Sequence, residues 1–458
     1  MFKNSLIFNF INKIFSYSQN KATYLWENSL FLQNIDNVIF ATIIGVFVLS
    51  TFASSDLIGY VALVTLFLTV IKLFLKKGEK VELNAFEICL LVYLLIVVIS
   101  LAGSSLFYLS LKGFLKTFTY LGFYFSAVQY FKSNLSKIPF SIAVIALCAG
   151  SQGIIGLFQN FAQVSEISTW QDVTNLNPEE VMTRVYGSIN PYNPNLLGGY
   201  LVASLSSLFG AAVLWFMDKK YKLAGSFLAL ALLTSYTLIL TGCRGAYIGL
   251  FVILAGMFGF LAKFIWCDLE NKKELFKKIY LSILGAMAVF STAVVLFVSS
   301  IRARVISIFA MRSDSSTSFR FNVYQSAFAM AKDNWLFGIG VGNQNFREIY
   351  GLYMKTGFDA LSSYSVFLEM AVESGVFALI AFLLFLFVFG KKALEFILAS
   401  RDLKLSVIVT VSLISVTAVM VHGLVDTIFF RPQVQFIFWS MVAFVSAVLR
   451  QEEASANA

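Results

Sequence analysis

The chain has 458 residues, of which 59% are hydrophobic and only 13% are charged, and its formal net charge is +9. An average soluble protein is about 45–50% apolar and about 25% charged, so this chain cannot cover a water-facing surface with its own charges. The composition therefore excludes a soluble enzyme, a disordered scaffold and a nucleic-acid-binding domain as the whole molecule.

The N-terminal segment 1–37 precedes the first long apolar run. Within residues 1–16, apolar side chains such as Phe2, Ile7 and Ile14 recur at helical spacing, with lysine and asparagine between them. This pattern predicts an amphipathic helix that lies in the membrane interface, and the alternative is a partly ordered polar tail. No cleavable signal peptide is visible in the segment.

The rest of the chain is dominated by apolar runs long enough to cross a bilayer, which takes roughly 17–25 residues. They predict an all-α polytopic membrane protein with about twelve transmembrane helices, a single membrane domain over residues 38–449 and a cytoplasmic tail at 450–458. The predicted spans are 38–54, 57–75, 85–102, 113–131, 138–161, 194–216, 223–241, 245–265, 279–300, 366–389, 404–421 and 434–449.

The basic residues predict the orientation, because cytoplasmic loops carry an excess of lysine and arginine. Twelve spans with both termini in the cytoplasm place most lysines inside, whereas eight of the ten arginines fall outside. Arginine presents a rigid fork of donors that suits phosphate and carboxylate. We therefore expect the outer, periplasmic face to bind an anion; the alternative is that single arginines pair with outer acids such as Glu179, Asp314 or Glu348.

Two connections on the predicted outer side are long, at residues 162–193 and 301–365. The second is too long for an idle connection. Within it, residues 318–335 carry apolar side chains at helical spacing, which predicts a helix along the outer membrane surface. Residues 338–346, GIGVGNQNF, predict a glycine-rich turn.

Three arginines stand out among the outer ones. Arg244, in LTGCRGAYIGL, begins a predicted span at the outer membrane boundary, where a charge is costly and indicates function. The alternative for Arg244 is a snorkelling side chain that fixes topology. Arg320 opens the helix of the long loop, and Arg184 lies just ahead of GSINPYNPNLLGGYL.

Two asparagines follow Arg184. Asn193 can cap the next helix, because a proline stands at the first helical position after it. Asn195 adds an amide that faces the outer surface. Both asparagines therefore support an outer site, or serve only as caps and turn residues.

Further polar residues lie near the C-terminal spans. Glu369 and Glu373 are four residues apart, share a helix face, and are expected to face the bundle interior one and two turns inside the membrane. VHGLVDTIFFRPQ holds His422, the only histidine, with Asp426 four residues later and Arg431 beyond. A single histidine is more often a helix-contact residue than a catalyst, so both roles stay open.

Cofactor motifs are not found in the sequence. The four cysteines are scattered without metal or redox spacing. With one histidine, a histidine–cysteine metal cluster is not expected. No phosphate-binding loop of the G-x-x-x-x-G-K-[ST] type occurs, so ATP is not an expected partner. The sequence predicts no metal, no cofactor and no nucleic-acid partner.

The order of these motifs resembles the O-antigen ligase and polymerase superfamily of bacterial inner membranes. The segments TRVYGSINPYNPNLLGGYL, TGCRGAYIGL, LSSYSVFLEMAVESG and HGLVDTIFFRPQVQ carry a closer likeness to its cyanobacterial IctB-type branch, the bicarbonate-transporter proteins. The resemblance covers most of the chain after residue 38. It implies a location in the bacterial inner membrane.

The resemblance also implies a chemistry. Ligases of the superfamily move a glycan from undecaprenyl diphosphate to an acceptor sugar at the periplasmic face, without a metal. By matching position, Arg244 and Arg320 are expected to clamp the diphosphate, with Arg184 as a third member. The partners are then the lipid bilayer and a polyprenyl-diphosphate-linked glycan. The alternative is a bicarbonate transporter, with a small anion as partner, or an accessory subunit of carbon uptake.

One position departs from the ligase pattern. Ligases carry a histidine nine residues ahead of the glutamate that corresponds to Glu373, and this histidine activates the acceptor hydroxyl. The present chain has Tyr364 there, and a tyrosine with a pKa of about 10 is a poor base at neutral pH. Either Tyr364 or a replacement such as Asp359 or Glu369 serves, or the chemistry differs, or the protein is not a transferase.

Overall fold

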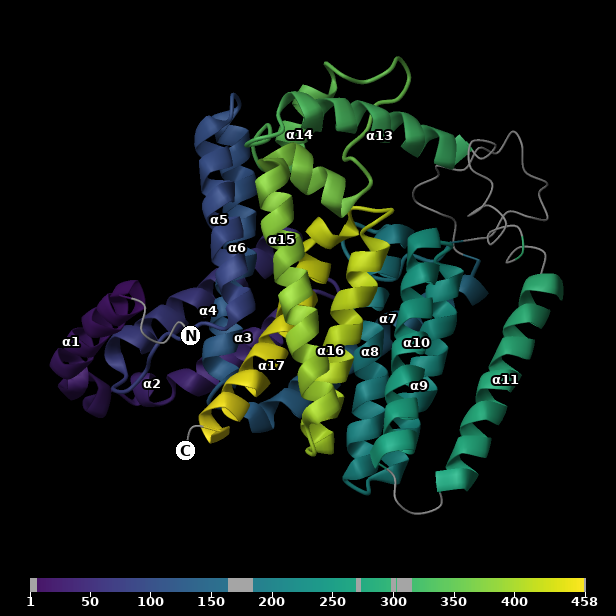
Figure 1. The fold of residues 1–458 in the computed structure, drawn as a ribbon, viewed down its shortest axis with the longest axis horizontal. Helices are drawn as coiled ribbons and strands as arrows, with labels where there is room; N and C mark the ends of the chain where they lie inside the picture. Colours follow the sequence, from purple (N-terminus) through teal and green to yellow (C-terminus); the bar gives the residue numbers. More distant parts are fainter. Residues whose placement is uncertain (1–5, 164–183, 269–272, 298–301, 303–314, 457–458) are drawn as a thin grey trace.

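The computed structural model describes residues 6–163, 184–268, 273–297, 302 and 315–456 (Figure 1). All regular structure in these ranges is helical. Within them, nine helices are long and apolar enough to cross a membrane. These are α4 (Ser55–Leu75), α5 (Ala85–Gly103), α7 (Ile138–Phe161), α8 (Pro194–Met217), α9 (Tyr221–Leu240), α10 (Arg244–Lys263), α15 (Val366–Ala399), α16 (Leu403–His422) and α17 (Pro432–Ala456).

The other three predicted spans are also helical. They correspond to α3 (Ile35–Leu49), α6 (Phe107–Phe131) and α11 (Lys273–Phe297). Helix α3 has 15 residues and is therefore about 22 Å long, less than the roughly 30 Å of a hydrocarbon core. The all-helical membrane architecture is confirmed, whereas the count of twelve spans and the cytoplasmic position of both termini stay predictions.

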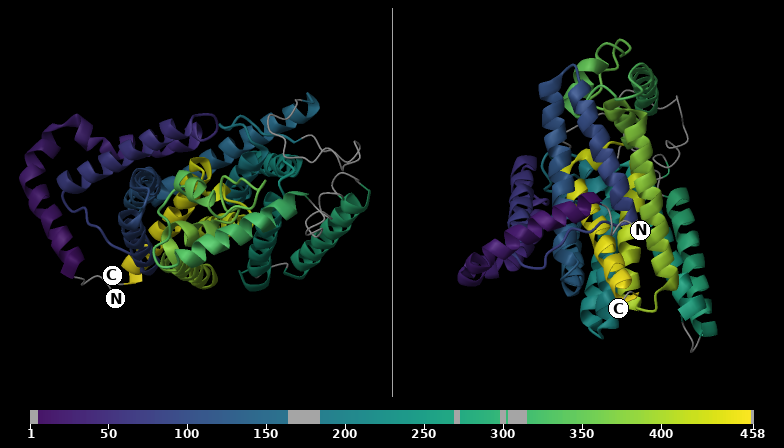
Figure 2. Two further views of the ribbon diagram at one scale, coloured as in Figure 1. Left: turned by 90° about the horizontal axis from the view of Figure 1, so that it is seen from above. Right: turned by 60° about the vertical axis from the view of Figure 1, so that its left-hand side comes forward.

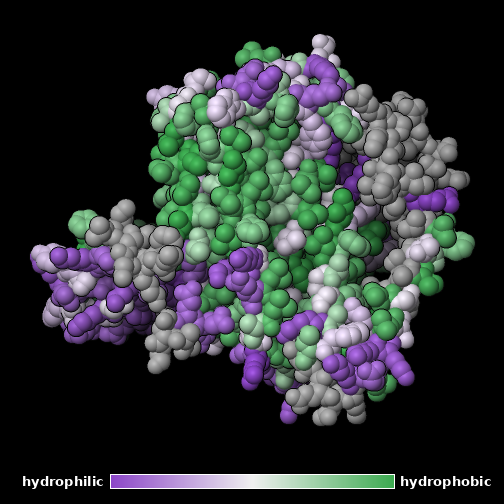
Figure 3. All heavy atoms as spheres, in the orientation of Figure 1, coloured by the Kyte–Doolittle hydropathy of each residue, from purple (hydrophilic) through white to green (hydrophobic). Residues whose placement is uncertain are grey.

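Helix α17 lies at the centre of the bundle and packs against α6, α8 and α16. Its most hydrophobic stretch is fully enclosed by protein. Glycines allow close packing in the same region: a side chain on Gly199 of α8 would meet Ile428, which lies just ahead of α17. The helices at the periphery of the bundle expose apolar side chains instead, and these form a broad hydrophobic area between hydrophilic ends (Figure 3).

The N-terminal segment forms helix α1 (Leu6–Asn28), followed by the short helix α2 (Leu30–Gln33). Helix α1 lies to one side of the bundle (Figures 1 and 2) and packs against α4. The Gln19 amide donates to the carbonyl of Leu73 at 2.8 Å, while Phe10 on the same helix is exposed. The part of the predicted helix that the structure describes, from Leu6 onward, is thus helical, and its place in the membrane interface stays a prediction.

The end of the bundle near the C-terminus is tied together by a buried ion pair. Arg450 of α17 lies 2.6 Å from the carboxylate of Glu87 on α5. The same carboxylate accepts hydrogen bonds from the Tyr124 hydroxyl and the Ser446 hydroxyl, both at 2.7 Å. Arg450 and Glu87 are therefore paired with each other, which offsets the cost of taking these two charges out of water.

The opposite end is covered by α13 (Ser315–Asp333), which lies across the bundle, and by α14 (Asn343–Tyr350) (Figure 1). Together with the first turns of α15 they form their own hydrophobic cluster, which includes Val323, Phe346 and Val372. We call α13, α14 and the first turns of α15 the outer cap. The helix predicted over 318–335 is confirmed.

The turn predicted at 338–346 is shorter than expected. Gly338, Gly340 and Gly342 have positive φ angles, and helix α14 then begins at Asn343. The turn is narrow because Gly342 lies against Gly113 of α6, where an added Cβ would come within 3.0 Å of the Gly113 Cα. The glycines therefore allow this turn to reach the tip of the α5–α6 pair.

Helix α15 is broken at Gly375, where φ is 81° and ψ is 173°. The predicted span 366–389 therefore contains a break that the apolar pattern did not indicate. The freed backbone groups pair with the segment that follows α13: the amide of Val376 donates to Trp335 at 2.8 Å, and the amide of Gly340 donates to Glu373 at 2.9 Å. The Ser100 hydroxyl donates to the same Glu373 carbonyl at 2.9 Å. The break thus fastens the outer cap to the bundle.

We predict that Gly375→Ala destabilises the protein. The backbone conformation at Gly375 is nearly restricted to glycine and costs other residues about 1–3 kcal/mol. An added Cβ would also lie 2.2 Å from the carbonyl oxygen of Leu336. Thermal unfolding in detergent should show a lower melting temperature for this variant.

Gly390→Ala is the matched control, because Gly390 lies in the same helix with open space around it. This variant should melt like the wild type. Equal melting temperatures for Gly375→Ala and Gly390→Ala would contradict the role of the break.

Candidate functional site

The candidate site is built around the turn between α9 and α10. Arg184 crosses this turn: its Nε donates to the carbonyl of Thr241 at 2.8 Å, and its Nη2 donates to the Asn195 side chain at 2.5 Å. The side chain packs over Gly242, whose φ of 62° closes the turn and where a Cβ would meet the Arg184 Nε at 3.1 Å. Arg184 is therefore held at the turn that leads into α10, whose first residue is Arg244.

The two asparagines have the structural roles that the sequence left open. The side chain of Asn193 caps α8 by accepting hydrogen bonds from the amides of Asn195 (2.8 Å) and Leu196 (3.3 Å). Asn195 itself orients Arg184. Both asparagines thus fix the start of α8 and, through Asn195, the position of an arginine.

Arg320 reaches the same region from the outer cap. Its Nη1 donates to the carbonyl of Val425, just past the end of α16, and its Nη2 lies 3.7 Å from the carboxylate of Asp426. Its guanidinium also stands over the ring of Tyr364, at 5.2 Å from the centroid. A guanidinium stacked on a ring and bonded to a carbonyl is fixed in orientation.

The ends of α10 and α16 meet directly between these arginines. Cys243, the residue before Arg244, places its Sγ 3.7 Å from Nε2 of His422. The ring fits because residue 245 is glycine: a Cβ there would lie 2.4 Å from the His422 Cδ2. The predicted residues Arg184, Arg244, Arg320, His422 and Asp426 therefore gather around one junction, which we call the α10–α16 junction.

Tyr364 borders this junction but differs from a catalytic base. Its φ is 54°, and its carbonyl accepts a hydrogen bond from the Tyr324 hydroxyl at 3.2 Å. Burial raises the pKa of the Tyr364 phenol above its usual value, and the neighbouring Arg320 offsets this only in part. The phenol is therefore protonated at neutral pH and can donate a hydrogen bond.

The three acidic candidates have different surroundings. Glu369 is buried, and its carboxylate accepts a hydrogen bond from the amide of Ser363 at 2.6 Å. Glu373 is also buried, and its side chain interacts with the backbone amide of Gly342 in the glycine-rich turn. Asp359 is exposed and lies close enough to Tyr364 to influence its ionisation. Glu369 and Glu373 therefore support loops of the outer cap, whereas Asp359 is accessible.

Arg431 is the remaining arginine of the motif that contains His422 and Asp426. It is exposed ahead of α17, and the hydrogen bonds described for it involve its backbone. The acidic part of the 162–193 connection and the start of the 301–365 connection fall on residues 164–183 and 303–314, which lie outside the described residues. The predicted pairing of arginines with Glu179 or Asp314 is therefore not tested.

Cys243 is the site residue that sequence reasoning missed. Its distance from His422 is 179 residues along the chain, so no spacing rule could pair them. The only signal was its position immediately ahead of Arg244 in a motif already singled out.

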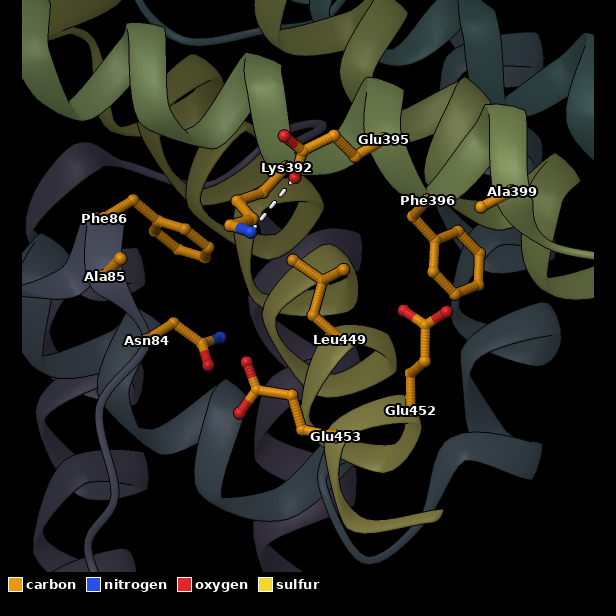
Figure 4. A pocket seen from close by; sticks show the side chains of 10 residues that line it. All are labelled: Asn84, Ala85, Phe86, Lys392, Glu395, Phe396, Ala399, Leu449, Glu452 and Glu453. Atoms are coloured by element: carbon orange, nitrogen blue, oxygen red, sulfur yellow. Dashed lines mark hydrogen bonds and ion pairs between the residues drawn. The ribbon is translucent and has the colours of Figure 1, made fainter. Parts of the chain in front are cut away.

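A separate pocket of about 240 Å³ lies far from this junction, where the start of α5 meets the ends of α15 and α17 (Figure 4). Glu395, Glu452 and Glu453 surround it, and Lys392 pairs with Glu395 at 3.0 Å. The arginines of the α10–α16 junction do not line this pocket. We therefore place the candidate site at the outer-cap end of the bundle.

The fold and the site together define a multi-pass helical membrane protein with an arginine-rich junction at one end. Residues 228–383 match the family described as O-Antigen ligase. The matched region runs from α9 into α15 and contains Arg244, Arg320 and Tyr364. This match supports the predicted relationship to the O-antigen ligase and polymerase superfamily, whereas the relationship to the IctB-type branch stays a prediction. No curated protein matches the chain.

We predict that Asn193→Ala destabilises the protein by about 1 kcal/mol, the usual cost of losing a helix N-cap. Asn193→Asp keeps an acceptor oxygen in the same place and should retain wild-type stability. Chemical unfolding in mixed micelles can measure both variants. If both variants lose the same free energy of unfolding, Asn193 does not stabilise the protein through the helix cap.

Proposed function

We propose that the protein transfers a glycan from a polyprenyl-diphosphate-linked saccharide at the outer face of the membrane. The observation that carries this proposal is the arrangement of Arg184, Arg244 and Arg320 around the α10–α16 junction. Departure of a lipid diphosphate develops negative charge, and fixed guanidinium donors stabilise that charge. The match of residues 228–383 to the O-antigen ligase family supports the same reaction class.

The electrostatics of the helix ends favour an anion at this position. The N-terminus of α10, which begins at Arg244, carries a partial positive charge. The C-terminal carbonyls near the ends of α9 and α16 have the opposite sign, and Arg184 and Arg320 donate to Thr241 and Val425 there. The junction therefore combines the N-terminus of α10, which begins at Arg244, with the guanidinium groups of Arg184 and Arg320.

We assign activation of the acceptor hydroxyl to Asp359. Tyr364 occupies the position of the ligase histidine, but burial keeps its phenol protonated. Glu369 is engaged with Ser363. Asp359 is the exposed carboxylate beside Tyr364, so an acceptor sugar can reach it from the outer side.

Bicarbonate transport is the second candidate, and the break in α15 is the observation that favours it. Transporters often bind ions at broken helices, because the freed backbone groups line a cavity. Here Trp335, Gly340 and Ser100 take up the backbone groups at the break. The break is therefore filled by protein, which favours the transferase over the transporter.

We predict that Arg320→Ala lowers the transfer rate about 100- to 1,000-fold, the usual effect of removing one donor that stabilises developing charge. Arg320→Lys should recover only part of the rate, because lysine lacks the planar fork. The assay is release of polyprenyl diphosphate from a lipid-linked saccharide by purified protein in liposomes.

Arg401→Ala is the control, because Arg401 is exposed in the connection between α15 and α16, away from the junction. It should keep full activity. If Arg320→Ala stays folded and fully active, or if the wild-type liposomes accumulate labelled bicarbonate and show no transfer, the proposed function is wrong.

We predict that Asp359→Asn lowers the turnover number, whereas Tyr364→Phe keeps the wild-type pH profile between about pH 6 and 9. The raised pKa of Tyr364 means that a tyrosinate base would operate only above about pH 10. Rates at saturating donor across this pH range test both statements. Two results would instead assign the base to Tyr364. One is an unchanged turnover number in Asp359→Asn, and the other is an alkaline rise in the wild-type rate that is lost in Tyr364→Phe.

A further inference from the structure

The α10–α16 junction contains a second constellation that glycan transfer does not use. Cys243, His422 and Asp426 are all buried, and each presents a metal-ligating atom: a thiol sulfur, an imidazole nitrogen and a carboxylate oxygen. These atoms lie within 4.8 Å of one another. We propose that the three residues bind a thiophilic divalent metal ion of the Zn²⁺ class, which joins the start of α10 to the end of α16.

The distance between the sulfur and nitrogen ligands fits tetrahedral coordination. Zn²⁺ binds sulfur at about 2.3 Å and nitrogen at about 2.0–2.1 Å, so a tetrahedral ion holds these two atoms roughly 3.6 Å apart. The Cys243 Sγ and the His422 Nε2 are 3.7 Å apart. An ion can therefore enter between them with little movement of either side chain.

The supporting contacts are those expected around metal ligands. The amide of Thr427 donates to Oδ1 of Asp426 at 2.7 Å, which fixes the carboxylate. Gly245 leaves room for the imidazole on the α10 side. Arg320 approaches the other oxygen of Asp426 at 3.7 Å, outside the ligand set. Such outer contacts orient ligands and increase metal affinity.

The charges also balance. A thiolate from Cys243, a carboxylate from Asp426 and a divalent ion sum to zero, so the loaded cluster adds no net charge beside Arg184 and Arg320. Three protein ligands are typical of zinc sites that keep one further position for water. A narrow crevice borders His422 and Asp426 but has no space for a water molecule, so a fourth ligand requires a local rearrangement there.

This site goes beyond the proposed function and does not depend on it. Its role is to hold two helix ends together, and any effect on transfer would follow from the position of Arg244 on α10 and of Arg320 beside Asp426. Metal binding can therefore be measured without a glycan donor.

The test is a Co²⁺ titration of the full-length protein in detergent after treatment with a chelator. We expect one Co²⁺ per chain, a near-ultraviolet thiolate-to-cobalt charge-transfer band, and displacement by Zn²⁺, which binds such sites more tightly. Cys243→Ser should lose the band and at least about 100-fold in affinity, more than a change in the outer contacts costs.

Cys148→Ser is the matched control, because Cys148 is a buried cysteine on α7 outside the cluster. It should keep both the band and the affinity. Asp426→Asn should keep the band and bind Co²⁺ more weakly. The proposal is overturned by a wild-type protein without the band, by a band that persists in folded Cys243→Ser, or by a band that disappears in Cys148→Ser.

Discussion

The end of the bundle that carries the outer cap depends on the hydrogen bonds that satisfy the backbone where α15 breaks at Gly375. Inside or near a bilayer, unpaired amides and carbonyls are costly, so a broken helix requires partners from the protein. The segment between α13 and α14 supplies them through Trp335 and Gly340. Because α13 leads directly into that segment, the same bonds set the position of Arg320 above the end of α16.

A second consequence follows from how the arginines are held. At the end of the bundle near the C-terminus, Arg450 is neutralised by the carboxylate of Glu87. Arg184 instead donates to a backbone carbonyl and a neutral amide. A neutral acceptor orients a guanidinium without cancelling its charge, whereas a carboxylate does both. The hydrogen bonds described for Arg184 thus orient it through uncharged acceptors, whereas Arg450 is held by a carboxylate.

The sequence predicted much of the fold, because apolar runs alone indicate where helices lie, and helices occur at all twelve predicted spans. It also singled out Arg184, Arg320 and Asp426, since charged residues near a membrane are rare. It could not predict the break at Gly375, because a glycine within an apolar run does not reveal its φ angle. It also could not pair Cys243 with His422, whose contact arises from the packing of α10 against α16.

The α10–α16 junction joins these points physically. Gly245 lets the His422 ring reach Cys243, and the contact brings the N-terminus of α10 against the C-terminus of α16. The helix ends of opposite polarity then stand side by side, with Arg320 bound to the carbonyl end. A displacement of either helix would move a positive charge relative to the others. The small residues at this junction thus determine the electrostatic field that an anionic ligand would meet.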